Sequence, residues 1–383
     1  MDAIWFLLGL LLLILVLWDV FETIVVPRPT PGWFRIGRYL VRGSWWLVRR
    51  VAGGPDCGAT RERLLGLYAP AATIGLLAAW LSALIVAFGL ILFAIRDQLD
   101  PAPTNLGTAL YFAASSVLTI GYGDVVATGP AARIAVVAAA ACGLGLVALV
   151  VTFVFSLFAS YQRREAPVVL LQAKAGSPLS AVVLLENLRR LGLDDHLPGF
   201  FGEWERWMVE VLDSHVAYPL LGYFRSSHDN LSWISALGTV LDTATLVLTT
   251  IEGVQRGTAE LAKDLGTHLV EDLSNLGYHG RAYSEIDRGD FAAVYGRLQD
   301  AGYQLAPEET AWTAFSAGRR DYAARLDGMA AFWAAPSVSW FGGRDPLRSP
   351  THRPEASAVA NGQPAATASS SSTPVIASSD EAR

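Results

Sequence analysis

The sequence predicts an all-α membrane protein with three membrane-crossing helices, followed by an all-α cytoplasmic domain and a disordered tail. Three observations support this fold class. The chain of 383 residues is 52% hydrophobic, with a mean hydropathy of +0.35, which is too apolar for an ordinary soluble protein. Three segments reach the length of about 20 apolar residues that a bilayer crossing needs. The alternation of apolar and polar residues that marks strands is nearly absent.

The three crossing segments run from Ala3 to about Val26, from about Ala71 to Ile95 directly after Pro70, and from about Ala131 to Ser160. The first segment lacks a basic start and a small-residue cleavage site, so we interpret it as a retained helix and not as a signal peptide. Pro167 is expected to end the third helix. These positions divide the chain into residues 1–26, 27–68, 69–162, 166–348 and a Ser- and Ala-rich tail at 349–383.

Arginine placement predicts the orientation of the chain. The stretch from Pro27 to Tyr68 carries eight arginines, namely Arg28, Arg35, Arg38, Arg42, Arg49, Arg50, Arg61 and Arg63. The stretch from Arg96 to Pro130 carries Arg96 alone against three aspartates, Asp97, Asp100 and Asp124. The positive-inside rule then places the first stretch and the C-terminal domain in the cytoplasm of a cell-membrane protein, with the N-terminus outside.

The basic stretch also predicts contact with lipid. Tryptophans at positions 33, 45 and 46 accompany the arginines, a composition typical of a helix that lies at the membrane surface. We expect it to bind anionic lipids through Arg35, Arg38, Arg42, Arg49 and Arg50. A voltage-sensing role is the weaker interpretation, because a sensor needs arginines inside a full-length crossing.

Between the second and third crossings lies TNLGTALYFAASSVL, residues 104–118, which is apolar but too short to span. It predicts a re-entrant helix that is capped by Thr104 and stops near Val117. The hexapeptide 119-TIGYGD-124 follows at membrane depth. Non-helical backbone is tolerated there only where protein buries it or where it lines a water-filled path.

The chemistry of the hexapeptide suits a dehydrated cation. Gly121 and Gly123 reach positive φ without steric cost, so the backbone can turn successive carbonyls to one side. The carbonyls of residues 119–122 and the Thr119 hydroxyl can then replace the water shell of an ion. The short helix before them directs its negative C-terminal end toward the same place.

These residues resemble the selectivity-filter signature of potassium channels, and the resemblance covers about residues 70–162. It is that of a two-transmembrane pore module of prokaryotic type, here with an extra N-terminal transmembrane helix. The resemblance implies a potassium-selective channel that is not an enzyme and has no cofactor beyond K⁺ as the permeant ion. It implies a filter formed by Thr119, Ile120, Gly121, Tyr122 and Gly123, with K⁺ held at the first four. One signature per chain implies a homotetramer.

The resemblance also implies supporting residues and a hinge. Filter support falls on Asp124, Tyr111 and Ser115, although the family often has tryptophans where this chain has Tyr111 and Phe112, and a carboxylate where it has Ser115. Tyr111 could still hydrogen-bond toward Tyr122. The family's inner-helix glycine falls on Gly143, nineteen residues after Asp124, and Gly145 could share or replace the hinge role.

Two acidic residues of the first crossing, Asp19 and Glu22, share one helix face. We interpret them as an interfacial pair that faces nearby arginines, and the alternative is contact with the re-entrant helix or a role in gating.

The region 166–348 predicts helices at 178–191, 203–216, 230–253, 255–276, 284–302 and 307–334. The apolar stretch 231–251 carries Asp242 at its centre and is expected to be a buried helix rather than a fourth crossing. His215 is expected to be a satisfied side chain and not a metal ligand. A net charge of −6 gives no reason to expect nucleic acid as a partner. A non-conducting membrane sensor or scaffold that acts through this domain is the alternative function.

Overall fold

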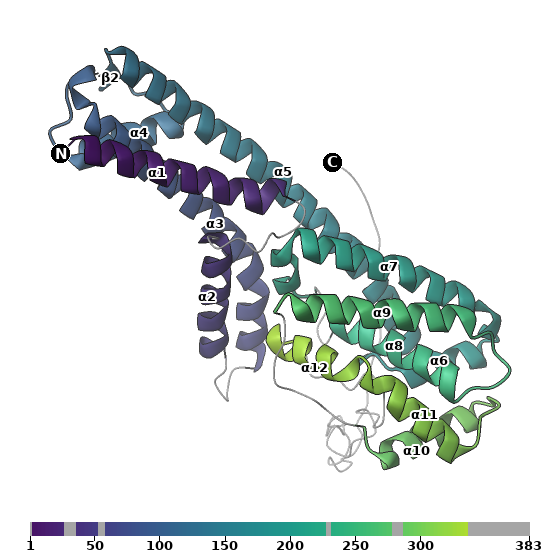
Figure 1. The fold of residues 1–383 in the computed structure, drawn as a ribbon. Coiled ribbons are helices and arrows are strands. Elements are labelled where there is room, and N and C mark those ends of the chain that lie inside the picture. Colours follow the sequence, from purple (N-terminus) through teal and green to yellow (C-terminus); the bar gives the residue numbers. More distant parts are fainter. Residues whose placement is uncertain (1, 27–35, 53–57, 227–230, 278–285, 336–383) are drawn as a thin grey trace, which may run out of the picture. The chain divides into compact units, whose positions relative to one another are not determined.

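The computed structural model describes residues 2–26, 36–52, 58–226, 231–277 and 286–335 (Figure 1). The side chains of Ile36, Arg38 and residues 58–60 are outside this description. The predicted tail at 349–383, the end of the predicted C-terminal domain and Arg35 also lie outside the described residues.

Among the described residues, three helices are long and apolar enough to cross a membrane, which confirms the number of predicted crossings. The first, α1 (Asp2–Val20), continues as a π-helical turn over Phe21–Val25. The second is α3 (Gly58–Ala94) and the third is α5 (Pro130–Ala175). The chain is therefore a helical membrane protein.

Both long helices continue through a proline that was expected to bound them. Pro70 lies inside α3 and Pro167 lies inside α5, so the predicted helix start after Pro70 and the predicted end at Pro167 are wrong. A proline removes one helical hydrogen bond, but packing on either side can hold the helix together. Ala69 before the first proline and Val168 after the second are fully buried. The third crossing thus continues as one helix to Ala175, and a short turn then leads into the next C-terminal helix.

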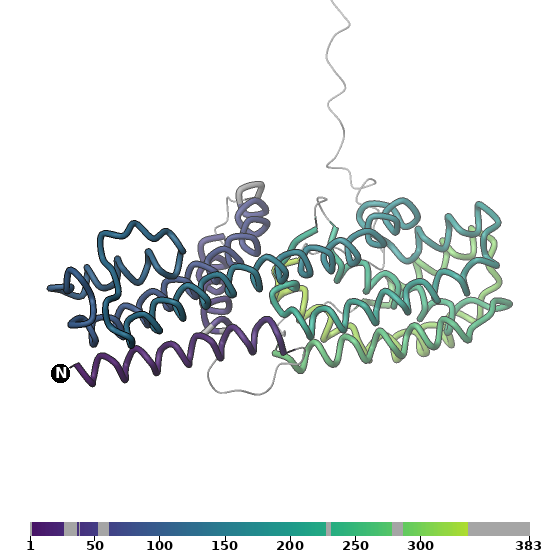
Figure 2. Tube along the Cα trace, turned by 90° about the horizontal axis from the view of Figure 1, so that it is seen from above, coloured from purple at the N-terminus to yellow at the C-terminus, as the bar shows by residue number. Residues whose placement is uncertain are grey.

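Helix α1 lies antiparallel along α3 (Figures 1 and 2). Gly9 allows this close approach, because a β-carbon there would meet the Ala87 carbonyl oxygen at 2.7 Å. Near the other end of α1, the buried Asp19 carboxylate accepts a hydrogen bond from the Trp80 indole of α3 at 2.8 Å. It also accepts one from the Gly37 amide of α2 (Ile36–Val51) at 3.5 Å. Asp19 thus joins three helices, and the expected contact of Asp19 and Glu22 with arginines remains a prediction.

A short helix and a pair of two-residue strands connect α3 to α5. A 3₁₀ turn at Arg96–Gln98 leads into β1 (Leu99–Asp100), which pairs antiparallel with β2 (Val126–Ala127). Between the strands lies α4 (Leu106–Val117). Its cap is Asn105, whose side chain accepts a hydrogen bond from the Thr108 amide at 3.0 Å. The predicted cap at Thr104 is therefore wrong by one residue, since it is Asn105 that adopts the extended backbone of a cap.

The C-terminal region is mainly helical in its described part, and its connecting segments include 3₁₀ turns at Asp194–His196 and Pro219–Tyr223 and an isolated β-bridge between Ile251 and Leu305. Its helices are α6 (Ala181–Arg190), α7 (Leu197–Ala217), α8 (Trp233–Thr249), α9 (Gly257–Asn275), α10 (Arg288–Asp300), α11 (Glu308–Arg320) and α12 (Ala323–Phe332). Every residue from Trp233 to Val247 is buried, so α8 is the core helix of this region. The expectation of a buried helix instead of a fourth crossing is confirmed.

The predicted single helix at 307–334 is wrong, because the chain breaks between α11 and α12. Tyr322 leaves helical geometry there, with φ −124°, and its hydroxyl donates to the Asp242 carboxylate at 2.5 Å. Arg319 at the end of α11 donates to the same carboxylate at 3.1 Å. A carboxylate in the middle of the core needs both donors, and the break in the helix supplies them.

Candidate functional site

The hexapeptide TIGYGD begins where α4 ends. The Leu118 amide still bonds the Ala114 carbonyl, and the Thr119 and Ile120 amides bond the carbonyls of Ser116 and Ser115 at 3.0 and 2.8 Å. The last turn of α4 thus holds the first two residues of the hexapeptide. From Gly121 on, the chain has no regular structure until β2.

Backbone handedness alternates along this segment. Thr119, Gly121 and Gly123 have φ values of +56°, +65° and +80°, whereas Ile120 and Tyr122 are not in the positive region. Alternating left- and right-handed residues can present successive carbonyl oxygens to one side of the chain. The two glycines were expected from the sequence. Thr119 was not, because a β-branched residue rarely adopts positive φ and nothing in the sequence signals it.

The predicted supporting residues lie around the hexapeptide. The Ser115 hydroxyl accepts a hydrogen bond from the Gly121 amide at 3.2 Å. The Tyr111 ring stacks on the Tyr122 ring, with centroids 6.5 Å apart and an interplanar angle of 4°. The Tyr111 hydroxyl interacts with the Asp124 carboxylate. Within one chain the two tyrosines stack, and a hydrogen bond from Tyr111 toward Tyr122 stays a prediction.

The two candidate hinge glycines have different surroundings. A β-carbon at Gly143 would come within 1.9 Å of the Val117 carbonyl oxygen, so α5 packs there directly on the last residue of α4. A β-carbon at Gly145 would meet nothing within 4 Å. Gly143 therefore has a packing reason to be glycine that Gly145 lacks. The hinge role of either residue stays a prediction.

The hexapeptide is exposed on the single chain, with Ile120 48% and Tyr122 69% accessible. Helix α5 exposes large apolar side chains along its membrane-length part, among them Ile134, Val137, Leu144 and Phe155. Lipid can cover a helix, but it cannot satisfy the polar groups of non-helical backbone. The hexapeptide therefore requires either further protein or water around it.

Within the part of the chain that the structure describes, no group of three or more His, Cys, Asp or Glu residues could hold a metal ion. His215 is buried and has partners at both ring nitrogens, the Val211 carbonyl at 2.8 Å and Arg164 at 3.3 Å. Burial, together with the charge of Arg164, lowers the pKa of His215 to about 3. His215 is therefore a side chain with satisfied hydrogen bonds, as the sequence predicts.

The described arginines of α2 face the C-terminal helices. Arg42 donates to the Leu276 carbonyl at the end of α9, and Arg49 donates to the Phe332 carbonyl at the end of α12. The Arg50 guanidinium lies 4.1 Å from the centre of the Trp46 ring. Together with Trp45 these residues line a cavity of about 500 Å³. Sequence reasoning missed the contacts with helix ends, since positive charge near a helix C-terminus is favourable but sequence does not tell which helix it will meet.

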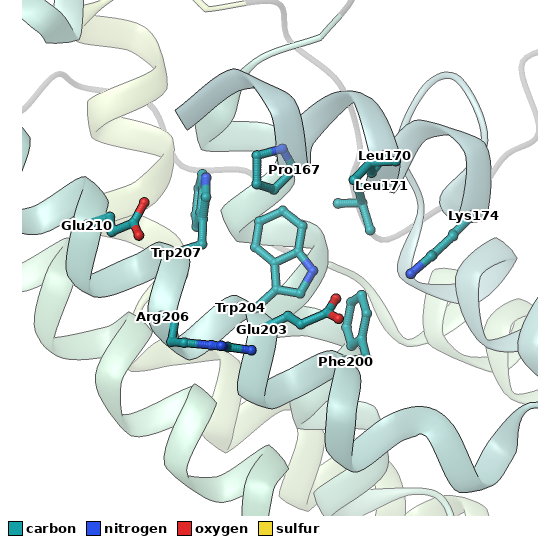
Figure 3. Close-up of a pocket in the computed structure, with 10 residues that line it drawn as sticks. All are labelled: Pro167, Leu170, Leu171, Lys174, Phe200, Glu203, Trp204, Arg206, Trp207 and Glu210. Carbon is teal, nitrogen blue, oxygen red and sulfur yellow. The ribbon is translucent and has the colours of Figure 1, made fainter. Parts of the chain in front are cut away.

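A second cavity, of about 320 Å³, lies between α5 and α7 (Figure 3). Trp204 stands at the middle of its lining, with Pro167 above it and with Lys174 and Glu210 on opposite sides. Aromatic side chains form its base and charged side chains lie at its rim. Phe200, Trp204 and Trp207 are also buried core residues, so their burial serves the packing of α7.

Residues 80–160 match the family described as "Ion channel". The resemblance to a potassium-channel pore module is thereby confirmed for this segment. The match covers the last part of α3, all of α4, the hexapeptide and α5 as far as Ser160, and it indicates a channel or transport role rather than an enzymatic one.

The chain is also similar to curated potassium-channel proteins. It is 30% identical over 93 residues to the delayed-rectifier potassium channel regulatory subunit KCNS3 of Rattus norvegicus, which is 24% of this chain and 19% of that protein. It is 29% identical over 92 residues to subunit KCNS2 of Mus musculus and of Homo sapiens, again 24% of this chain and 19% of each relative. The chain thus spans about a fifth of the length of these relatives. No solved structure matches it significantly.

Proposed function

We propose that the chain is a subunit of a potassium-selective channel in which TIGYGD is the selectivity filter. The observation that carries the proposal is the alternation of positive φ at Thr119, Gly121 and Gly123 directly after a short helix. It fits a ladder of inward-facing carbonyls, and the ion channel match at residues 80–160 supports the same assignment.

In this mechanism K⁺ exchanges its water for protein oxygen. The carbonyls of residues 119–122 and the Thr119 hydroxyl take the place of the hydration shell, so the energy of dehydration is offset as the ion enters. Helix α4 points its C-terminal end toward the start of this ladder, and the partial negative charge there stabilises a cation. Ser115, Tyr111 and Asp124 hold the ladder in shape from behind.

We further propose that four copies of the chain surround one pore. A single chain contributes one strand of carbonyls and leaves Ile120 and Tyr122 exposed. A closed ring of four strands would cover the segment and complete the coordination of the ion. The N-terminus would then lie outside and the helical region in the cytoplasm, as the distribution of arginines predicts.

Two finer assignments belong to the same proposal. Gly143 would be the hinge of α5, where it meets the end of α4. The basic cavity lined by Arg42, Arg49 and Arg50 would take the phosphate of an anionic lipid, with Arg35 and Arg38 nearby in the chain.

The printed names of the relatives favour a second candidate function. They are described as regulatory subunits, so this chain could act as a channel-like sensor or scaffold that does not conduct by itself.

Recording from purified protein in planar bilayers, with K⁺ on one side and Na⁺ on the other, separates the two functions. A reversal potential close to that for K⁺, lost in Gly121→Ala but kept in Gly75→Ala, would support the first. Gly75 is a suitable control because it lies in α3 with ordinary φ and nothing within 4 Å of an added β-carbon. Absence of current from verified, inserted protein would favour the regulatory alternative.

A further inference from the structure

Helix α5 holds a short segment of the C-terminal region, residues 221–225, through two side chains. Arg164 donates to the Leu221 carbonyl at 3.0 Å and to the Phe224 carbonyl at 2.8 Å. The Tyr161 hydroxyl, one helical turn earlier, donates to the Arg225 carbonyl at 3.1 Å. These contacts fix the main chain of the segment to the part of α5 that follows its membrane-length portion.

The same segment is held from the other side by α2 and α3. Arg225 forms a two-pronged ion pair with Glu62 of α3, with Nη2 to Oε1 at 2.9 Å and Nε to Oε2 at 3.0 Å. The Tyr223 ring packs against Trp45 of α2 and Tyr68 of α3, with ring centroids 5.2 and 5.6 Å away. Arg225 also donates to the Ala334 carbonyl just after α12.

Burial of the Arg164 guanidinium costs desolvation free energy, so specific partners must stabilise the side chain in its position. It is 2% exposed, and it pairs with the Glu165 carboxylate at 2.9 Å. The Trp207 indole of α7 donates to the Arg164 carbonyl at 2.9 Å. A buried guanidinium is tolerated only when its donors are satisfied, and removal of one partner from such a pair leaves an uncompensated charge. Arg164 therefore has little freedom to move independently of residues 221–225, to whose carbonyls it donates hydrogen bonds.

Residues 221–225 are themselves tightly packed. A β-carbon on Gly222 would come within 2.5 Å of the Trp333 ring, so this residue fits tightly against the end of α12. Each residue from Leu221 to Arg225 thus makes a contact outside its own segment, and together these contacts involve α2, α3, α5 and the residues after α12.

We propose that Arg164 and Arg225 are positioning residues that couple the C-terminal helices to the pore. Arg164 holds residues 221–225 from α5, and Arg225, the last residue of that segment, ties it to Glu62 of α3. A displacement of the C-terminal helices therefore moves the end of α5 and the α2–α3 pair together. Helix α5 packs on the end of α4 at Gly143, so this movement reaches the hexapeptide. This regulatory role rests on the proposed function, because it assigns α5 to the lining of a pore.

Hydrogen exchange of the full chain in phospholipid nanodiscs tests the coupling without any recording of current. We expect Arg164→Gln to speed exchange about tenfold or more at residues 221–225 and also in α2 and at residues 61–70 of α3, which Arg164 does not touch. Arg163→Gln is the matched control, since Arg163 is the adjacent arginine, is exposed and bonds only Ser160 among the described contacts. Faster exchange confined to residues 221–225 and α7 would overturn the proposal.

Substitutions of Arg225 test the same coupling in the reverse direction, from α3 toward α5. Arg225→Gln should speed exchange at residues 160–175 of α5, and Arg225→Lys should do so less, because lysine keeps the charge but not the two-pronged pair. The double variant Arg164→Gln with Arg225→Gln should add little to either single change, since both act on one segment. Additive and purely local effects would contradict the coupling even if Arg164→Gln alone folded poorly.

Recording separates this proposal from the proposed function. In a conducting protein, Arg164→Gln and Arg225→Gln should alter open probability several-fold while the reversal potential in K⁺ and Na⁺ stays unchanged. Unchanged open probability in both variants would overturn the regulatory role. If the unaltered protein carries no current, the proposed function fails, and the exchange experiment still decides whether the coupling exists.

Discussion

Gly143 and Val117 meet so closely that a β-carbon at position 143 would lie 1.9 Å from the Val117 carbonyl oxygen. This contact joins the third crossing to the last residue of α4, which only Leu118 separates from the hexapeptide. A change in the position of α5 at this point therefore acts on the segment where we propose that K⁺ binds.

The first prediction concerns this contact. We expect Gly143→Ala to force α4 and α5 apart and to destabilise the fold by about 1–3 kcal/mol, the usual range for overpacking. Gly145→Ala should fold like the unaltered chain, because nothing lies within 4 Å of its added carbon. Thermal unfolding of both variants in detergent measures the difference. Equal melting temperatures for the two would contradict the packing argument.

The second prediction concerns the support of the hexapeptide. Ser115→Ala removes the acceptor for the Gly121 amide, and a hydrogen bond of this kind contributes about 1 kcal/mol. We expect the population of the conducting conformation to fall about fivefold, with ion selectivity retained because the carbonyl ladder is unchanged. Single-channel recording gives both quantities. Ser116→Ala is the control, since Ser116 bonds the Phe112 carbonyl within α4, and an equal effect there would refute a specific role for Ser115.

Much of the membrane part could be predicted because its signals are local. The length of an apolar run gives a crossing, and the pattern TIGYGD gives the glycine positions that need positive φ. The helix boundaries at Pro70 and Pro167 could not be predicted, because local proline chemistry predicts a stop while packing from distant residues decides that the helix continues.

The contacts of the C-terminal helices could not be predicted from the sequence either, because they too depend on residues that are distant along the chain. In the sequence, Arg164 is one of two adjacent arginines at the inner end of a crossing. In the structure its neighbour Arg163 is exposed, whereas Arg164 is buried. Apart from the adjacent Glu165, its side-chain partners His215, Leu221 and Phe224 lie 51 to 60 positions away along the chain. Nothing in the local sequence indicates them, so the coupling segment at 221–225 is visible only in the fold.

The third prediction concerns the core of the C-terminal helices. Burial, together with the nearby Asp242 carboxylate, raises the pKa of Tyr322 well above its usual value, so the phenol is a permanent donor. Tyr322→Phe should destabilise this region by about 1–3 kcal/mol, because a buried carboxylate loses a hydrogen bond. Hydrogen exchange of α8 amides in the full chain should rise accordingly. Tyr39→Phe is the control, since Tyr39 is 68% exposed, and an equal rise there would contradict the assignment.

The fourth prediction is a dependence of stability on pH that originates at His215. Burial and the charge of Arg164 lower its pKa to about 3 in the folded chain, against 6.5 for a free histidine. Below about pH 6.5 the unfolded chain therefore binds a proton that the folded chain does not, so stability should fall as the pH drops from 6.5 toward 3. The slope contributed by one such group approaches 1.4 kcal/mol per pH unit, as an order-of-magnitude limit.

His215→Gln should flatten this slope, even if it lowers stability at pH 7, because glutamine does not titrate. Thermal unfolding of the unaltered chain and of this variant between pH 7 and pH 4 measures the two slopes, and a slope that survives His215→Gln would place the titrating group elsewhere.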